Sequence, residues 1–167
     1  MKAYMCLSCK AGAYNKVLHD LMKLDIPRGD IFLLFGPIDI LVQFKGLKSL
    51  DEFSEKWFTP IRMVCCKETL VTRTMTFVVV SEGTSYADEP FAFTFLNVQP
   101  QQLENAQKAL MTVPEAISAD IVFGPYDIIS PLRAKNQADL ERVVSHIHEA
   151  VPGIEGAATT IDAMIRI

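Results

Sequence analysis

The hydrophobic and polar positions of the chain follow the same order of patterns in its two halves. Hydrophobic and polar side chains alternate along residues 3–9 and 91–98, which predicts a strand at each place. Residues 14–24 and 100–112 carry Leu, Val, Met and Ala at helical spacing, which predicts a helix after each strand. Each half therefore opens with a strand followed by a helix.

A six-residue motif recurs after these helices. The segment FGPIDI at 35–40 returns as FGPYDI at 123–128, and apolar runs flank both copies. Glycine tolerates unusual φ values, proline fixes φ, and aspartate bonds to nearby backbone amides. Each copy therefore predicts a turn that joins two antiparallel strands.

A second helix is predicted in each half, at 49–58 and at 137–150. Ser49 is followed by Glu52 three residues later, and this spacing is that of a capping box. The first of these helices is therefore expected to begin at Ser49.

Each half ends in a predicted strand, at 72–80 and at about 157–167. The order in each half is βαββαβ, the ferredoxin-like plan also found in ACT domains and dimeric α/β barrels. We expect an α+β fold with a first unit at 1–80, a linker at 81–90 and a second unit at 91–167.

A ferredoxin-like unit covers only one face of its antiparallel sheet with helices, so the other face needs a second sheet. A tandem copy supplies that sheet within the same chain. The sequence therefore predicts two tandem units whose sheets associate as an intrachain pseudo-dimer.

The charge and hydropathy of the chain argue against nucleic acid and membrane as partners. The net charge is −4 and the Lys and Arg residues form no cluster, so direct binding to nucleic acid is not expected. No run approaches twenty apolar residues, so no membrane span is expected. The N-terminus has the pattern of a strand rather than of a signal peptide, so the expected location is the cytoplasm.

The four cysteines are expected to be free thiols in a reducing compartment. Cys6 and Cys9 have CxxC spacing, but residues three apart on a strand point to opposite faces. Cys65 and Cys66 are adjacent, which does not suit a tetrahedral site. We expect no metal and no cofactor.

The histidines and the motifs give no sign of catalysis. His146 and His148 lie two apart on a predicted helix, about 200° around it, so they do not share a face. The chain has no Gly-x-Ser-x-Gly elbow and no glycine-rich phosphate loop. The expectation is that the protein is not an enzyme and has no catalytic residues.

The second half resembles a known family. The stretch IVFGPYDIISPLRAKNQADLERVVSHIHEAVPGIEGAATT at 121–160 resembles the effector-sensing domain of the Lrp/AsnC transcription regulators, and the resemblance extends over 91–167. The first half resembles this domain less closely, through its own FGPID, LDEF and TRT segments.

This resemblance implies a domain that pairs through its sheets and binds amino acids or similar metabolites. It also implies a pocket lined by the Gly-x-x-Asp turn and by a Thr-x-Thr segment on the last strand. In the first half the matching ligand-binding residues are Gly36, Asp39, Thr72 and Thr74. In the second half they are Gly124, Tyr126, Asp127, Thr159 and Thr160, with Ala157 where a first threonine is expected.

The regulators of this family carry a helix-turn-helix before the sensor, whereas here the first strand is predicted at residue 3. The resemblance therefore implies a stand-alone sensor of an amino-acid-like effector, with regulation that does not use direct DNA binding. The expected partners are the effector, further copies of the chain in a homodimer or larger assembly, and a transcription regulator.

Three alternatives stay open at this point. The Gly-Pro-x-Asp segments can serve only as turns, with Asp bonding its own backbone. A dimeric α/β-barrel enzyme, such as a small monooxygenase or isomerase, would use a side chain from the strands, for example Lys45, Arg73 or Arg133. A protein-interaction subunit without a ligand would use an apolar surface such as that of Trp57 and Phe58.

Overall fold

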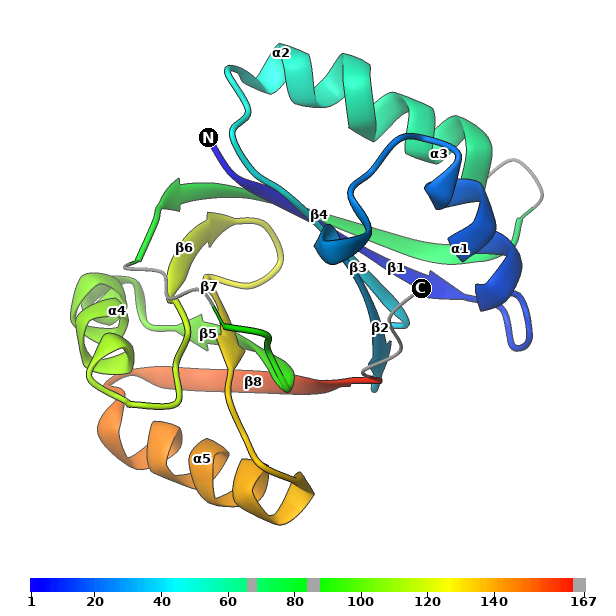
Figure 1. Cartoon of the computed structure of the whole chain (residues 1–167). Coiled ribbons are helices and arrows are strands. Elements are labelled where there is room, and N and C mark those ends of the chain that lie inside the picture. Colours follow the sequence, from blue (N-terminus) through cyan, green and yellow to red (C-terminus); the bar gives the residue numbers. More distant parts are fainter. Residues whose placement is uncertain (66–68, 84–87, 164–167) are drawn as a thin grey trace. The chain divides into compact units, whose positions relative to one another are not determined.

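The computed structural model describes residues 1–65, 69–83 and 88–163, and the chain forms two compact units (Figure 1). The first unit comprises Met1–Phe77 and the segment that begins at Ala163. The second unit comprises Val78–Asp162. No helix within the described ranges is long and apolar enough to cross a membrane.

The first unit is an antiparallel sheet with helices. Its strands are β1 (Ala3–Cys9), β2 (Ile31–Phe35), β3 (Ile40–Phe44) and the first part of β4 (Val71–Ser81). Its helical segments are α1 (Tyr14–Met22), η1 (Arg28–Asp30), α2 (Leu50–Phe53), η2 (Ser54–Phe58) and α3 (Thr59–Cys65). β3 pairs with both β1 and β2, and the Lys10 N–H donates to the Leu70 carbonyl at 2.8 Å just before β4.

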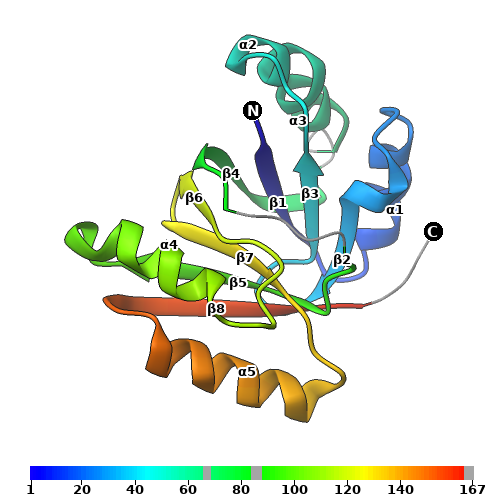
Figure 2. The same ribbon diagram turned by 60° about the vertical axis from the view of Figure 1, so that its left-hand side comes forward.

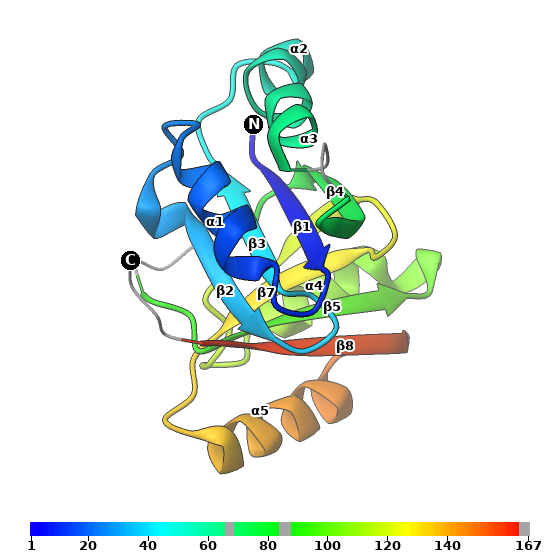
Figure 3. The same cartoon turned by 90° about the vertical axis from the view of Figure 1, so that its right-hand side faces the viewer.

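The helices of the first unit cover one face of this sheet. Figure 3 shows α1 lying over β1, β2 and β3. Val17 and Leu21 of α1 are buried against Met5 and Leu7 of β1, and the aromatic side chains of α2 and η2 pack on the same core. The Phe44 ring lies 5.6 Å from that of Trp57, so the half-buried Trp57 side chain packs against the core.

The helix predicted at 49–58 begins as expected but continues to Cys65. The Ser49 hydroxyl accepts the Glu52 N–H at 3.1 Å, and this bond caps the helix. The helix then passes through a π-helical segment directly before Pro60. Proline has no N–H and its ring crowds the carbonyl four residues back, so a local change of helix geometry is expected there. Residues 66–68 lie outside the described part.

The second unit has the same order of elements. Its strands are β5 (Ala92–Val98), β6 (Asp120–Phe123), β7 (Ile128–Leu132) and β8 (Ile154–Asp162), and its helices are η3 (Pro100–Gln102), α4 (Leu103–Met111) and α5 (Gln137–Ala150). β5 pairs with β7 and β8, and β6 pairs with β7. Figure 2 shows α5 beside β8.

Two strand ends complete the sheets of the two units. In the second unit, the end of β4 pairs with β6, with Val78 opposite Phe123. In the first unit, the Ala163 N–H donates to the Leu33 carbonyl of β2 at 2.8 Å. The last strand begins three residues earlier than predicted, at Ile154, directly after Gly153 with a φ of 75°. Residues 164–167 of the predicted strand, and 84–87 of the predicted linker, lie outside the described part.

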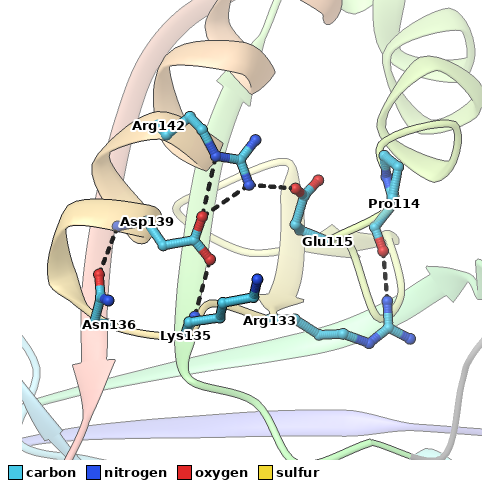
Figure 4. A network of polar contacts seen from close by, with 7 residues as sticks. All are labelled: Pro114, Glu115, Arg133, Lys135, Asn136, Asp139 and Arg142. Atoms are coloured by element: carbon cyan, nitrogen blue, oxygen red, sulfur yellow. Dashed lines mark hydrogen bonds and ion pairs between the residues drawn. The ribbon is translucent and has the colours of Figure 1, made fainter.

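Side chains on one turn of α5 fix its N-terminus (Figure 4). The Asn136 amide oxygen accepts the Asp139 N–H at 2.9 Å, and the Asp139 carboxylate accepts the Lys135 N–H at 2.9 Å. Together they form a reciprocal cap that satisfies two free backbone donors. The Lys135 backbone N–H and the Arg142 side chain both donate hydrogen bonds to Asp139, and these bonds lower the pKa of its carboxyl.

Arg142 also joins α5 to the segment between α4 and β6. Its guanidinium donates to the Glu115 carboxylate at 2.6 Å and to Asp139 at 2.9 Å, as Figure 4 shows. The bond from Arg142 lowers the pKa of Glu115. Arg133 holds the same segment by donating to the Pro114 carbonyl at 2.6 Å.

Replacing Glu115 with Gln is expected to lower the free energy of unfolding by less than about 1 kcal/mol near neutral pH, because solvent screens a partly exposed pair. The pKa of Glu115 is lower in the folded than in the unfolded state, so its contribution is complete above the unfolded-state value of about 4.3. The contribution is lost as the pH falls through the folded-state pKa. Urea unfolding between pH 7 and pH 3 should therefore show a difference from wild type that disappears at the acid end.

Glu141→Gln is the matched control, because it neutralises an exposed carboxylate next to Arg142 on α5. The same pH profile in both variants would contradict a stabilising Glu115–Arg142 pair.

Candidate functional site

The two Gly-Pro-x-Asp turns have the same hydrogen bonds in both units. In the first turn the Leu34 N–H donates to the Asp39 carbonyl at 2.8 Å, and the Asp39 N–H donates to the Leu7 carbonyl at 3.1 Å. The Asp39 carboxylate accepts the Cys9 N–H at 2.7 Å. The turn is thereby tied to the end of β1.

The second turn repeats each of these bonds. The Val122 N–H donates to the Asp127 carbonyl at 2.9 Å, and the Asp127 N–H donates to the Leu96 carbonyl at 2.9 Å. The Asp127 carboxylate accepts the Val98 N–H at 2.9 Å. Asp39 and Asp127 therefore perform the same structural task, which is to cap the end of the neighbouring strand.

A polar side chain of the strand completes each turn. The Ser8 hydroxyl donates to the Pro37 carbonyl at 3.2 Å, and the Asn97 amide donates to the Pro125 carbonyl at 3.2 Å. Ser8 and Asn97 therefore hold equivalent places. The sequence analysis missed both residues. An alignment of the β1 sequence with the β5 sequence would have matched Ser8 with Asn97.

The aspartates are more than turn formers in one respect. A carboxylate has two oxygens and accepts several hydrogen bonds, whereas each cap uses one oxygen. Both aspartates are half-buried. Gly36 and Gly124 are exposed beside them, and Gly36 has a φ of 151°, which favours glycine.

The first unit brings Thr72 to its turn. The Thr72 hydroxyl donates to the Ser8 carbonyl at 3.1 Å, so β4 contributes a polar group next to Ser8. Thr74 lies two residues further along β4 and is half-buried. Side chains two apart on a strand share a face, so Thr74 lies on the side of Thr72.

The second unit does not bring Thr159 and Thr160 to Asp127. Thr159 lies opposite Thr94 and Thr160 opposite Phe93, four and five residues along β5 from Val98. At the rise of a strand, four residues correspond to about 13 Å. The two threonines also point to opposite faces: the Thr159 hydroxyl bonds to that of Thr94 at 3.2 Å, and the Thr160 side chain is fully buried.

Aromatic side chains flank both turns. The Tyr126 ring lies 5.5 Å from that of Phe95, which fixes it on the sheet, whereas the matching Ile38 is buried. Phe35 is 66% exposed and the matching Phe123 is 80% exposed. Two large apolar side chains are therefore open to solvent at the same place in both copies of the motif.

Among the described residues, the histidines and Cys6 are not part of the hydrogen bonds of the turns. Cys6 is buried, and burial raises the pKa of its thiol, which keeps it protonated. His19, His146 and His148 are exposed. Lys45 is one of the cationic residues considered above for catalysis. Its Nζ lies 3.3 Å from Oδ1 of Asp30, with which it forms an ion pair.

Substituting Asp127 with Ala is expected to lower the free energy of unfolding by about 1 to 2 kcal/mol, because the Val98 N–H loses its acceptor. Asp127→Asn keeps an oxygen at the same position and should cost clearly less. The same order is expected for Asp39→Ala and Asp39→Asn, measured by denaturant unfolding. Ala variants as stable as wild type would show that the carboxylates do not cap the strands.

Solved structures with a similar fold include enzymes. The chain aligns over 98% of its length with 71% of the siroheme decarboxylase NirDL, at 8% identity and a TM-score of 0.58. It aligns over 96% of its length with 91% of a candidate monooxygenase from Lactobacillus acidophilus NCFM, at 13% identity and a TM-score of 0.55. A comparison with curated proteins finds no match.

These structures correct one expectation. The absence of catalytic motifs predicted that the protein is not an enzyme, and this prediction is wrong, because the fold is shared with a decarboxylase and a candidate monooxygenase. The error came from treating missing sequence motifs as evidence against catalysis, although this fold hosts enzymes whose chemistry does not depend on them.

The second half of the chain has a family match. Its residues 91–162 match the model of the Lrp/AsnC ligand binding domain. A hypothetical protein from Pyrococcus horikoshii aligns with 44% of the chain over 89% of its own length, at 23% identity and a TM-score of 0.41. The matched residues include β5 to β8 and the second turn.

Proposed function

We propose that the chain is a sensor of a small, amino-acid-like effector, built from two copies of an Lrp/AsnC-type ligand-binding unit. The copies are residues 1–80 and 91–167, with 81–90 between them. One observation carries the proposal: the hydrogen bonds of the turn in the family-matched half recur in the other half. Such a match over several residues is not expected of two unrelated hairpins.

The chemistry of the turns suits a ligand that carries an ammonium group. The second carboxylate oxygen of Asp39 or Asp127 accepts hydrogen bonds from the ammonium, and the charges attract. The backbone amides at Gly36 and Gly124 and the Thr74 hydroxyl are the groups available to a carboxylate, whereas the Thr72 hydroxyl donates to the Ser8 carbonyl. Of the threonines, Thr72 and Thr74 lie on the side of the first turn, and Thr72 bonds to Ser8.

The effector is proposed to act through association. A transcription regulator is the partner to which we infer that the sensor passes its state. Self-association of the chain, as a homodimer or larger assembly with closed symmetry, is proposed as the second contact. The two exposed phenylalanines of the motif are apolar groups available for such contacts.

A thermal-shift screen of the twenty amino acids and common catabolites tests the effector. A ligand that binds only the folded state at a hundredfold excess over its Kd adds about 2.7 kcal/mol of stability, which raises Tm by several degrees. Asp39→Asn and Asp127→Asn keep the strand caps and remove one charge each. We expect at least one of them to abolish the shift.

If no compound in the screen raises Tm, or if both Asn variants respond like wild type, the turns are not effector sites. Glu141→Gln, which removes a charge far from either turn in sequence, serves as the control for net charge.

Light scattering tests the proposed assembly. We expect a mass of at least two chains at tens of micromolar. Phe123→Ser should reduce that mass if the exposed aromatic of the second turn is part of the contact, because it removes apolar area from the surface. A monomer for the wild type at this concentration would contradict self-association.

A further inference from the structure

The two units carry net charges of opposite sign. Residues 1–77 contain 11 Lys and Arg against 8 Asp and Glu, which gives a formal net charge of +3. Residues 78–162 contain 4 Lys and Arg against 12 Asp and Glu, which gives −8. Arg166 completes the total of −4. The units therefore offer surfaces of opposite sign to another copy of the chain.

The strand ends beside the first turn are basic. β1 and β2 are both antiparallel to β3, so they end at the same edge of the first sheet (Figure 3). Lys10 follows β1 directly, and its N–H bonds to the Leu70 carbonyl, which brings the start of β4 to the same edge. Lys10 and Arg73 are exposed, and neither forms an ion pair within the described residues. The residues that we call the first edge are Lys10, Phe35, Asp39 and Arg73.

The matching strand ends of the second unit are acidic. β5 and β6 are both antiparallel to β7, so they end together beside the second turn. Gln99 takes the place of Lys10, because its N–H bonds to the Gly153 carbonyl as that of Lys10 bonds to Leu70. Glu155, near the start of β8, is exposed and has no ion pair in the described part of the chain. The residues that we call the second edge are Gln99, Phe123, Asp127 and Glu155.

The two edges have the same apolar centre. Phe35 and Phe123 are 66% and 80% exposed, so each offers roughly 100 to 200 Å² of apolar surface. A stable interface buries about 800 Å² on each partner, so one pair of phenylalanines makes only a small contact. The charges around the phenylalanines therefore decide which edges meet, and a stable assembly needs more than one such contact.

We propose that the first edge of one chain binds the second edge of another copy of the same chain. Phe35 then meets Phe123 of the other copy. Lys10 and Arg73 lie opposite Glu155 of that copy, whereas two first edges would bring cations together. With two-fold symmetry the contact forms twice, so each chain uses both of its edges. This inference rests on the proposed self-association and specifies the surfaces that meet.

Charge reversal tests which edges meet. Arg73→Glu and Glu155→Lys each create a pair of like charges, and each should raise the dissociation constant of the assembly about tenfold, because the contact forms twice. An equimolar mixture of the two variants should recover the affinity of the wild type, since each variant then meets an opposite charge in the other. Light scattering over a dilution series at low ionic strength measures these affinities.

Lys48→Glu is the matched control for Arg73→Glu. Lys48 is an exposed cation of the first unit, and it lies at the other end of the sheet, because the Leu47 N–H bonds to the Met1 carbonyl before β1. This variant changes the net charge equally and should leave the dissociation constant unchanged. Denaturant unfolding midpoints will show whether each variant is folded.

The outcomes separate the two proposals. A monomeric wild type would overturn self-association and this inference together. If the wild type associates but Arg73→Glu and Glu155→Lys associate as tightly or more tightly, other surfaces meet, so this inference fails while self-association stands. A mixture that stays as weak as the single variants, or an equal loss in Lys48→Glu, would also overturn the pairing of the two edges.

Discussion

The bond between an aspartate carboxylate and the amide at the end of a neighbouring strand organises each half of this protein. Cys9 donates to Asp39 and Val98 donates to Asp127, across about thirty residues of chain in each case. The bond satisfies a backbone donor where strand pairing ends and fixes the turn against the sheet. Without it, Gly36 and Pro37 would define a bend but not its position. The side chains around the turn depend on that position.

The same bond prepares the aspartate for a second task. Its carboxylate is held by one oxygen, so the other is oriented before a ligand arrives, and the entropy of ordering the side chain is already lost in folding. The cap and the proposed ligand contact are therefore compatible. The Gly-Pro-x-Asp motif can form a turn and contact a ligand in the same conformation. What differs between the halves is the surrounding set: Ser8 and Thr72 in the first, Asn97 and Gly156 in the second.

Sequence patterns predicted the order of elements because it depends on local periodicity and on a repeated motif. α5 was predicted at the residues where it lies, and β1 likewise. The continuation of the first unit's helix to Cys65 was not predicted, because it depends on a π-helical segment before Pro60. Thr159 and Thr160 were predicted at the second turn, whereas the structure pairs them with Thr94 and Phe93 of β5, away from Asp127. Their position depends on strand register, which is set by pairing and not by local sequence.

The most direct test of this account is an NMR titration that follows the amide signals of Cys9 and Val98 while an amino-acid amide is added. Both amides bond to an aspartate carboxylate, so each reports on ligand contact at its own turn. The account predicts a saturable shift of at least one of these two signals. Unchanged signals at both amides while the ligand binds would contradict it.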